Sequence, residues 1–247
     1  MLLVHGLGGH SNNWEYLSEY LQEKDITSYG IELKGFGATE DLKGHIDSLN
    51  TYIKDVRRLN NIIKRRHKGK KVFLIGESMG GIIAFMTAIK KPDLFDGIVC
   101  ISPGFWSLLK FSFPDYVKMI SARFYKPDKQ FRMPFDSRIC TRDPEMQKMI
   151  DADPLEHRFA TPKLLQSILL AQIYSRFFKH KISTDILFQV AGNDEFVDTP
   201  TSIKIFEGLR ARNKKLIEYD EMKHSLVAEI GKEKVFEDTL QWVRERL

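Results

Sequence analysis

The chain has 247 residues, of which 43% are hydrophobic and 29% are charged, and its formal net charge is +5. This composition is ordinary for a globular protein, and the length suits a single α/β domain as well as two smaller domains. Basic residues concentrate only at positions 64–71, and without zinc-finger spacing or interleaved aromatic residues this run indicates the solvated end of a helix rather than a site for nucleic acid or anionic lipid.

Short apolar runs alternate with amphipathic stretches along most of the chain. They predict strands at residues 2–5, 26–33, 72–76, 97–102, 185–191 and 216–220, and helices at residues 11–23, 49–66, 80–90, 199–212 and 232–246. Strands that read as continuous apolar runs between helices are typical of a parallel sheet covered on both faces. We therefore expect an α/β fold with a mostly parallel sheet, in a single domain over residues 1–247, with ligands bound at the carboxyl ends of the strands.

The alternation stops over residues 104–183, where apolar helical stretches and proline-containing loops replace it. We interpret this region as a mostly helical cap inserted over the carboxyl edge of the sheet, and a conventional set of core helices is the alternative. Its first part is rich in large apolar side chains, which either line the cap and the substrate pocket or dip transiently into a lipid surface. The candidate pocket residues are Phe105, Trp106, Leu109 and Phe113.

The two cysteines, Cys100 and Cys140, are too few for a disulfide framework or a metal site. Cys100 lies in an apolar run and is expected to be a buried, inert thiol. No apolar run reaches the roughly 18–20 residues of a membrane span, and the N-terminus lacks the basic start and long apolar stretch of a signal peptide. We therefore expect a cytoplasmic protein, with peripheral contact with a membrane as an open alternative.

A serine between two glycines follows the third predicted strand, in the run Gly76-Glu77-Ser78-Met79-Gly80. The G-x-S-x-G pattern alone is weak because glycine and serine are common residues. Its setting between a strand and a helix is that of a nucleophile elbow, the sharp turn that lifts a serine hydroxyl above the sheet edge. The glycines leave room where backbones come close, and the helix N-terminus favours negative charge. We therefore predict that Ser78 is a nucleophile rather than a structural turn residue.

A serine hydroxyl needs a base that takes its proton, and in this arrangement the acid and the histidine follow the serine in the chain. His224 is the only histidine near the C-terminus, and it follows the last predicted strand. Asp194 and Asp198 both follow the strand predicted at 185–191. Because Asp198 precedes Thr199 and Pro200, it reads as a helix N-cap, which favours Asp194 as the residue that orients His224. Asp198 remains the alternative.

Acyl transfer also needs backbone N–H donors for the oxyanion. Met79, directly after the nucleophile, supplies one donor, and Leu7 in the glycine loop after the first strand is the candidate for the second. His5 is expected to be structural. The glycine loop does not match the dinucleotide fingerprint, because Ser11 stands where the third glycine belongs, and the chain has no Walker-type phosphate loop. We therefore expect no cofactor and no metal.

With these residues in place, the chain resembles the α/β-hydrolase superfamily, and within it the monoacylglycerol lipase and lysophospholipase-like serine hydrolases of the Hydrolase_4, serine aminopeptidase S33 type. The matching segments span nearly the whole chain and are Val4-His5-Gly6-Leu7-Gly8, Lys34-Gly35-Phe36-Gly37, Lys43-Gly44-His45-Ile46-Asp47-Ser48, Gly76-Glu77-Ser78-Met79-Gly80-Gly81, Asp153-Pro154-Leu155, and residues 194–198 followed by Lys223-His224. The resemblance implies a triad of Ser78, Asp194 and His224, an oxyanion hole formed by Leu7 and Met79, and an apolar acyl site under a helical cap.

Three features depart from the family pattern. Glu77 stands where histidine is common, residues 34–37 read K-G-F-G rather than R-G-H-G, and the chain starts at what would be the third strand of the family's sheet. A natural minimal version and an internal start of a longer chain are the two explanations for the last feature. A sheet that has lost this edge hairpin can still fold, but its exposed edge is a liability.

These observations predict a serine carboxylic-ester hydrolase that forms an acyl-enzyme, with a monoacylglycerol or a lysophospholipid ahead of a short generic ester as its substrate. A general carboxylesterase, or an enzyme that hydrolyses a carbon–carbon bond, an amide or a lactone, is the alternative on the same scaffold. A non-catalytic interaction protein is a further alternative, which the presence of all three triad candidates disfavours.

Overall fold

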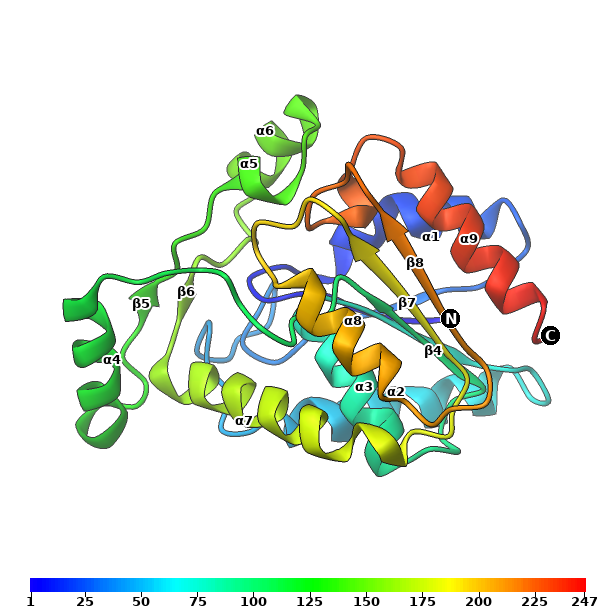
Figure 1. The fold of residues 1–247 in the computed structure, drawn as a ribbon, viewed down its shortest axis with the longest axis horizontal. Coiled ribbons are helices and arrows are strands. Elements are labelled where there is room, and N and C mark those ends of the chain that lie inside the picture. The colour runs from blue at the N-terminus through cyan, green and yellow to red at the C-terminus, as the bar shows by residue number, and fades with distance from the viewer.

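Six parallel strands form one sheet through the middle of the molecule (Figure 1). The computed structural model describes residues 1–247. The strands lie in the order β2-β1-β3-β4-β7-β8, and every neighbouring pair is parallel. Their bounds are β1 Leu2–Val4, β2 Tyr29–Ile31, β3 Phe73–Glu77, β4 Gly97–Ile101, β7 Ile186–Ala191 and β8 Lys214–Tyr219. The prediction of an α/β fold around a parallel sheet is confirmed.

Helices cover both faces of this sheet, because successive residues of each strand point to opposite sides. In β3, Leu74 packs in one apolar cluster and Ile75 in the other. The first cluster joins the sheet to α2, α3 and α8, and the second joins it to α1 and α9 (Figure 1). The bounds of these helices are α1 Glu15–Gln22, α2 Asn50–Arg66, α3 Met79–Lys90, α8 Thr199–Glu207 and α9 Lys232–Arg244, and short 3₁₀ helices occupy Ser11–Trp14, Lys179–Lys181 and Leu226–Ala228.

The predicted strands and helices are all present, with some of their ends shifted. The strand expected at 26–33 shortens to β2, which forms one edge of the sheet and pairs only with the three residues of β1. The helix expected at 199–212 ends at Glu207, because the next residue is Gly208 and glycine is a poor helix former.

The segment between β4 and β7 interrupts the alternation of strands and helices. It contains α4 Phe113–Tyr125, β5 Phe131–Arg132, α5 Ser137–Cys140, α6 Pro144–Ala152, β6 Phe159–Ala160 and α7 Pro162–Phe178. The antiparallel ribbon of β5 and β6 was not predicted, because two residues per strand are too few to show a periodic pattern. Helix α7 lies along α3, whereas α4, the ribbon, α5 and α6 stand beside the carboxyl ends of the sheet strands (Figure 1).

The cysteines, the basic run and the hydropathy of the helices are three further features on which the sequence makes predictions. Cys100 is buried and burial raises the pKa of its thiol, as expected of an inert cysteine. Cys140, for which no such prediction was made, is also buried, and burial raises the pKa of its thiol too. The basic run at 64–71 ends α2 and continues into an exposed turn, which fits a solvated helix end. The chain contains no helix that combines the length and the apolar character needed to cross a membrane.

Candidate active site

Ser78 lies at the sharp turn between β3 and α3. Its backbone has φ 55° and ψ −115°, an unusual conformation for a residue other than glycine, and its N–H donates to the carbonyl oxygen of Ile101 in β4 at 2.9 Å. The flanking glycines are required by close approach: a Cβ on Gly76 would lie 2.1 Å from the Gly80 oxygen, and a Cβ on Gly80 would lie 2.0 Å from the Val4 oxygen. The G-x-S-x-G pattern therefore forms the elbow that the sequence predicts.

The glycine loop after β1 runs directly beside Ser78. A Cβ on Gly6 would lie 3.2 Å from the Ser78 Cβ, and the next residue, Leu7, lines the same cavities as Ser78. Met79 is the first residue of α3, so its N–H belongs to the helix turn that has no acceptor within the helix. The two predicted oxyanion donors thus belong to the two backbone segments that flank the Ser78 side chain.

His224 and Asp194 form a buried pair at the same edge of the sheet. The Asp194 Oδ2 lies 2.8 Å from the His224 Nδ1, and the Asp194 Oδ1 accepts from the N–H groups of Phe196 and Val197 at 2.8 Å each. The side chain of Asp194 is 0% exposed and that of His224 is 5% exposed. This geometry fixes the Nδ1 of the imidazole and leaves Nε2 for the cavity that His224 shares with Ser78.

Asp198 has a different role, because its side chain accepts from the N–H of Thr201 at 2.9 Å and caps α8. The N-cap interpretation of Asp198 is confirmed. The structure brings Asp194, and not Asp198, into contact with His224.

The ionisation of His224 reflects opposing influences. Burial lowers the pKa of the imidazole, but the charge and the hydrogen bond of Asp194, together with the charge of Glu77, more than offset this effect. The pKa of His224 therefore lies above its ordinary value.

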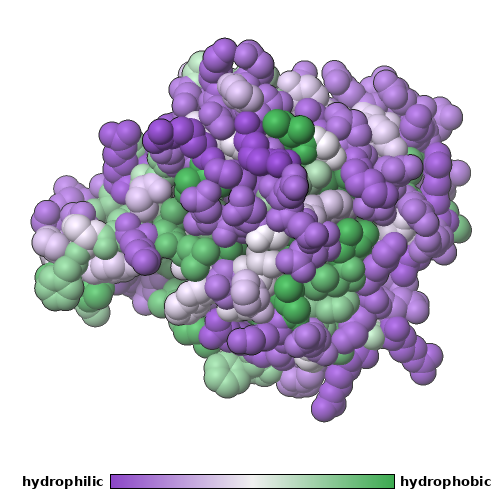
Figure 2. All heavy atoms as spheres, turned by 45° about the horizontal axis from the view of Figure 1, so that its top comes forward, coloured by the Kyte–Doolittle hydropathy of each residue, from purple (hydrophilic) through white to green (hydrophobic).

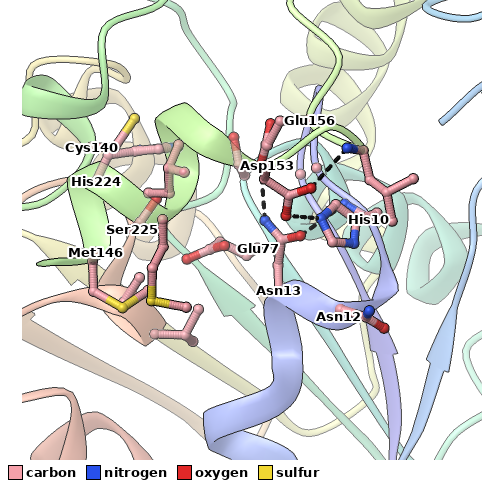
Figure 3. A pocket seen from close by; sticks show the side chains of 18 of the residues that line it. His10, Asn12, Asn13, Glu77, Cys140, Met146, Asp153, Glu156, His224 and Ser225 are labelled. Carbon is pink, nitrogen blue, oxygen red and sulfur yellow. Dashed lines mark hydrogen bonds and ion pairs between the residues drawn. The ribbon is translucent and has the colours of Figure 1, made fainter. Parts of the chain in front are cut away.

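Glu77, the residue that departs from the family pattern, is buried beside the catalytic candidates. It is 8% exposed, and its Oε1 has no hydrogen-bond partner. Burial raises the pKa of Glu77 to about 7, and the positive form of His224 acts in the opposite direction. In Figure 3, Glu77 lies between the His224–Ser225 segment and the wall that carries Asn13 and His10.

Replacing Glu77 with glutamine is expected to change both pH dependence and stability. Without the Glu77 charge the pKa of His224 falls, so the acid limb of kcat/KM moves to lower pH. A carboxyl whose pKa is raised by folding from 4.5 to about 7 destabilises the fold increasingly as the pH rises between these values. Glu77→Gln should therefore raise the free energy of unfolding by up to about 3 kcal/mol at pH 8 and by little below pH 4.

Rate profiles and denaturant titrations of the two proteins over pH 4–9 would test this expectation. Glu19→Gln, a change on the exposed face of α1, serves as the charge-matched control. An acid limb that stays in place in Glu77→Gln would show that Glu77 does not act on the histidine.

Two cavities meet at Ser78. One has a volume of about 330 Å³ and is lined mainly by apolar side chains from the segment after β4, α4 and α7, with no Asp, Glu, Lys, Arg or His among them. The other, called the polar cavity because it alone contains acidic and histidine side chains, has a volume of about 500 Å³, and about half of its lining residues are apolar. Its acidic and histidine side chains are Glu15, Glu77, Asp153, Glu156, His10 and His224, and it contains no lysine or arginine. Leu7, Ser78 and Phe196 line both cavities.

The predicted pocket residues divide into two groups. Trp106 and Leu109 line the apolar cavity, whereas Phe105 and Phe113 do not. Phe105 is fully buried and packs against Phe85 and Phe188 in the core above the sheet. Phe113 is 80% exposed at the start of α4. The pocket prediction for these two residues is therefore corrected.

The polar cavity has a wall that was not predicted from the sequence. His10 Nε2 lies 2.8 Å from Asp153 Oδ2, and the Asn13 amide donates to Glu156 Oε1 at 3.1 Å, so the loop after β1 is tied to the segment after α6 (Figure 3). The Phe196 ring stacks on His224 at a centroid distance of 4.7 Å. Only two of these residues could have been suspected from the sequence. Asp153 lies in a segment that resembles the family, and Phe196 lies between the two candidate aspartates.

His5 is structural, as predicted. It is buried, its Nε2 accepts from the N–H of Leu33 at 3.1 Å, and its Nδ1 lies 2.8 Å from the Gly6 oxygen. Burial lowers the pKa of His5 to about 4, so the ring is neutral and holds the glycine loop in place. No group of three or more His, Cys, Asp or Glu side chains is arranged to hold a metal ion.

The covered parallel sheet, the serine on a strained strand-to-helix turn and the buried histidine–aspartate pair define an α/β-hydrolase. The chain belongs to the Hydrolase_4 family, described as serine aminopeptidase S33, whose family model matches residues 1–231.

Several relatives of this chain act on lipid esters according to their names. Human monoglyceride lipase is 27% identical over 256 residues, covering 100% of this chain and 82% of the relative. Phospholipase YtpA of Bacillus subtilis is 26% identical over 242 residues, covering 96% and 91%. The crystal structure of the Paleococcus ferrophilus monoacylglycerol lipase matches with a TM-score of 0.90 at 25% identity, covering 100% of this chain and 94% of that one. The predicted resemblance, and the prediction of an enzyme similar to ester hydrolases, are confirmed.

Proposed function

We propose that the protein is a serine carboxylic-ester hydrolase in which Ser78 is the nucleophile, His224 the base and Asp194 the residue that orients the base. His224 takes the Ser78 proton as the hydroxyl attacks the ester carbonyl, and it then gives that proton to the leaving alcohol. Water, activated by the same histidine, releases the acid from the acyl-enzyme. The observation that carries this proposal is the 2.8 Å bond between Asp194 and His224, at a cavity that Ser78 shares.

We further propose that the N–H groups of Leu7 and Met79 hold the oxyanion. Each donor of this kind contributes about 2.7–4 kcal/mol to the stabilisation of the transition state. The support is the close approach of the glycine loop to Ser78 and the position of Met79 at the first turn of α3.

The two cavities divide the substrate into an acyl part and an alcohol part. The apolar cavity suits an acyl chain, and the polar cavity suits an alcohol with hydroxyl groups. A phosphate group would meet four carboxylic acids and no lysine or arginine in the polar cavity, which disfavours a lysophospholipid. A monoacylglycerol is therefore the substrate class that the geometry supports best.

The experiment that tests this proposal compares substrates with the same acyl chain. Hydrolysis of 1-acylglycerols of increasing chain length is expected to exceed that of the matched lysophosphatidic acids by about tenfold or more in kcat/KM. Matched anilides and lactones test the amide and lactone alternatives, and labelling by a fluorophosphonate probe tests whether Ser78 reacts at all. Faster hydrolysis of the phosphate-bearing substrates would contradict the assignment of the polar cavity.

We propose that residues 104–183 act as a cap within a single domain and that α4 touches the lipid surface that supplies the substrate. Figure 2 shows hydrophobic residues along the lower side of the end of the molecule where Figure 1 places α4. The exposed apolar side chains of this helix are Phe113, Tyr116, Val117, Ile120, Phe124 and Tyr125, and Tyr116 also lines the apolar cavity. The apolar face thus continues into the proposed acyl site.

Replacing Phe124, which is 84% exposed, with serine should weaken co-sedimentation with phospholipid vesicles by several-fold. Hydrolysis of a short soluble ester should stay unchanged, because Phe124 lines neither cavity. Equal co-sedimentation of the variant and the wild type would contradict the contact.

A further inference from the structure

The two backbone amides that flank His224 are both tied to the cap. The N–H of Ser225 donates to the carbonyl oxygen of Cys140 at 2.8 Å. The N–H of Lys223 donates to Glu229 Oε2 at 2.9 Å, and Glu229 in turn binds the cap. The loop that presents the base is therefore held from the segment that joins α5 to α6.

Glu229 is the centre of this connection. Its side chain is 0% exposed, and its carboxylate accepts from the N–H of Arg142 at 3.0 and 3.2 Å and from the N–H of Ile230 at 2.7 Å. The Arg142 Nε lies 3.4 Å from Oε1 and supplies a nearby positive charge. Thr141 adds a second link, because its hydroxyl donates to the Ala228 oxygen at 2.8 Å. A buried carboxylate with this many donors is held in one orientation.

The cap segment bound by Glu229 also shapes the cavity. Cys140 lines the polar cavity, and the following helix α6 contributes Met146, Met149 and Ile150 to the same wall. This wall is thus bonded, directly through Cys140 and indirectly through Glu229, to the peptide groups on either side of His224. Two carboxyl groups influence the ionisation of the imidazole: that of Asp194, which lies 2.8 Å from Nδ1, and that of Glu77.

We propose that Glu229 is a positioning residue: through its bonds to Arg142 and Lys223, it makes the orientation of His224 depend on the position of the 140–142 segment of the cap. The inference rests on the proposed role of His224 as the base. Glu229 lines neither cavity, so it acts on the reaction through the histidine loop. The reacting geometry of the base is then complete only when the 140–142 segment of the cap is in place.

The test compares Glu229→Gln, Thr141→Val and the double variant in p-nitrophenyl butyrate hydrolysis over pH 5–9, with the rate of fluorophosphonate labelling measured alongside. Glutamine places an NH₂ group among N–H donors and loosens the loop. We expect kcat to fall roughly 10- to 100-fold in Glu229→Gln and several-fold in Thr141→Val, with KM nearly unchanged. The loosened bond between His224 and Asp194 should move the acid limb of the profile to lower pH.

The double variant shows whether the two residues act through one connection. Coupling predicts a loss smaller than the product of the two single losses. Glu233→Gln, at an exposed position of α9, is the control and should match the wild type. The proposal would be overturned if the loss of kcat were the same at every pH and proportional to the unfolded fraction of each variant. It would also be overturned if the two substitutions lowered kcat independently of each other. If Glu229→Gln does not fold, Thr141→Val alone tests the proposal. A wild-type kcat and a wild-type pH profile in Thr141→Val would then contradict the coupling.

Failure of the proposed function would look different. In that case the wild type itself would hydrolyse no ester and its Ser78 would not react with the fluorophosphonate. If the wild type is active and labelled while the variants match it, only the coupling through Glu229 is wrong.

Discussion

Replacing Ser78 with alanine is expected to abolish ester hydrolysis, with a fall in kcat of about 10⁶-fold where chemistry limits the rate. The change removes the one hydroxyl that lies at the junction of the two cavities and beside the glycine loop. Alanine keeps the Cβ, so the residue at this turn, which has φ 55°, has the same steric strain as serine. The fold should therefore persist. Turnover of p-nitrophenyl butyrate and of a 1-acylglycerol, measured beside thermal unfolding, gives the comparison.

Ser102→Ala is the matched control for this experiment. Ser102 is also a buried serine with a positive φ, of 38°, and it follows the neighbouring strand β4, but it lines neither cavity. Its removal should leave kcat within about twofold of the wild type. Comparable activity in Ser78→Ala and Ser102→Ala would remove Ser78 from the proposed mechanism.

The parts of the site that follow from the sequence are those whose signals are local. The turn around Ser78 is bounded by a strand and a helix, and both glycines have steric reasons that can be stated without the fold. His224 and Asp194 each follow a strand of the same sheet, so parallel topology alone brings them to one edge. Even the choice between Asp194 and Asp198 follows from local capping chemistry.

The parts that escaped prediction depend on how the insertion packs. Phe105 and Trp106 are adjacent in an apolar run, yet one is fully buried between core rings and the other lines a cavity. Glu229 looks like an ordinary loop carboxylate, because its partners Thr141 and Arg142 lie far away in the sequence. Apolar periodicity indicates which segments are buried, but the facing of single side chains in an irregular segment follows only from the tertiary contacts.

Replacing Asp194 with asparagine is expected to lower kcat by about 10⁴-fold while the site keeps its shape. In the proposed mechanism the Asp194 carboxylate, 2.8 Å from His224 Nδ1, accepts from that nitrogen and leaves Nε2 as the base. An asparagine amide removes the negative charge and, where its NH₂ group faces the ring, favours the wrong tautomer. The pKa of His224, which Asp194 raises, should also fall, so the remaining activity should extend to lower pH. The pH profile of kcat/KM for a short ester provides the measurement.

Asp198→Asn makes the same chemical change four residues away. Because asparagine caps helices about as well as aspartate, this variant should keep its stability and remain within about twofold of the wild-type kcat. The contrast between the two variants separates a charge that acts on the base from one that only begins a helix. A large loss in Asp198→Asn together with an active Asp194→Asn would reverse the assignment of the acid and leave the 2.8 Å bond between Asp194 and His224 without a catalytic consequence.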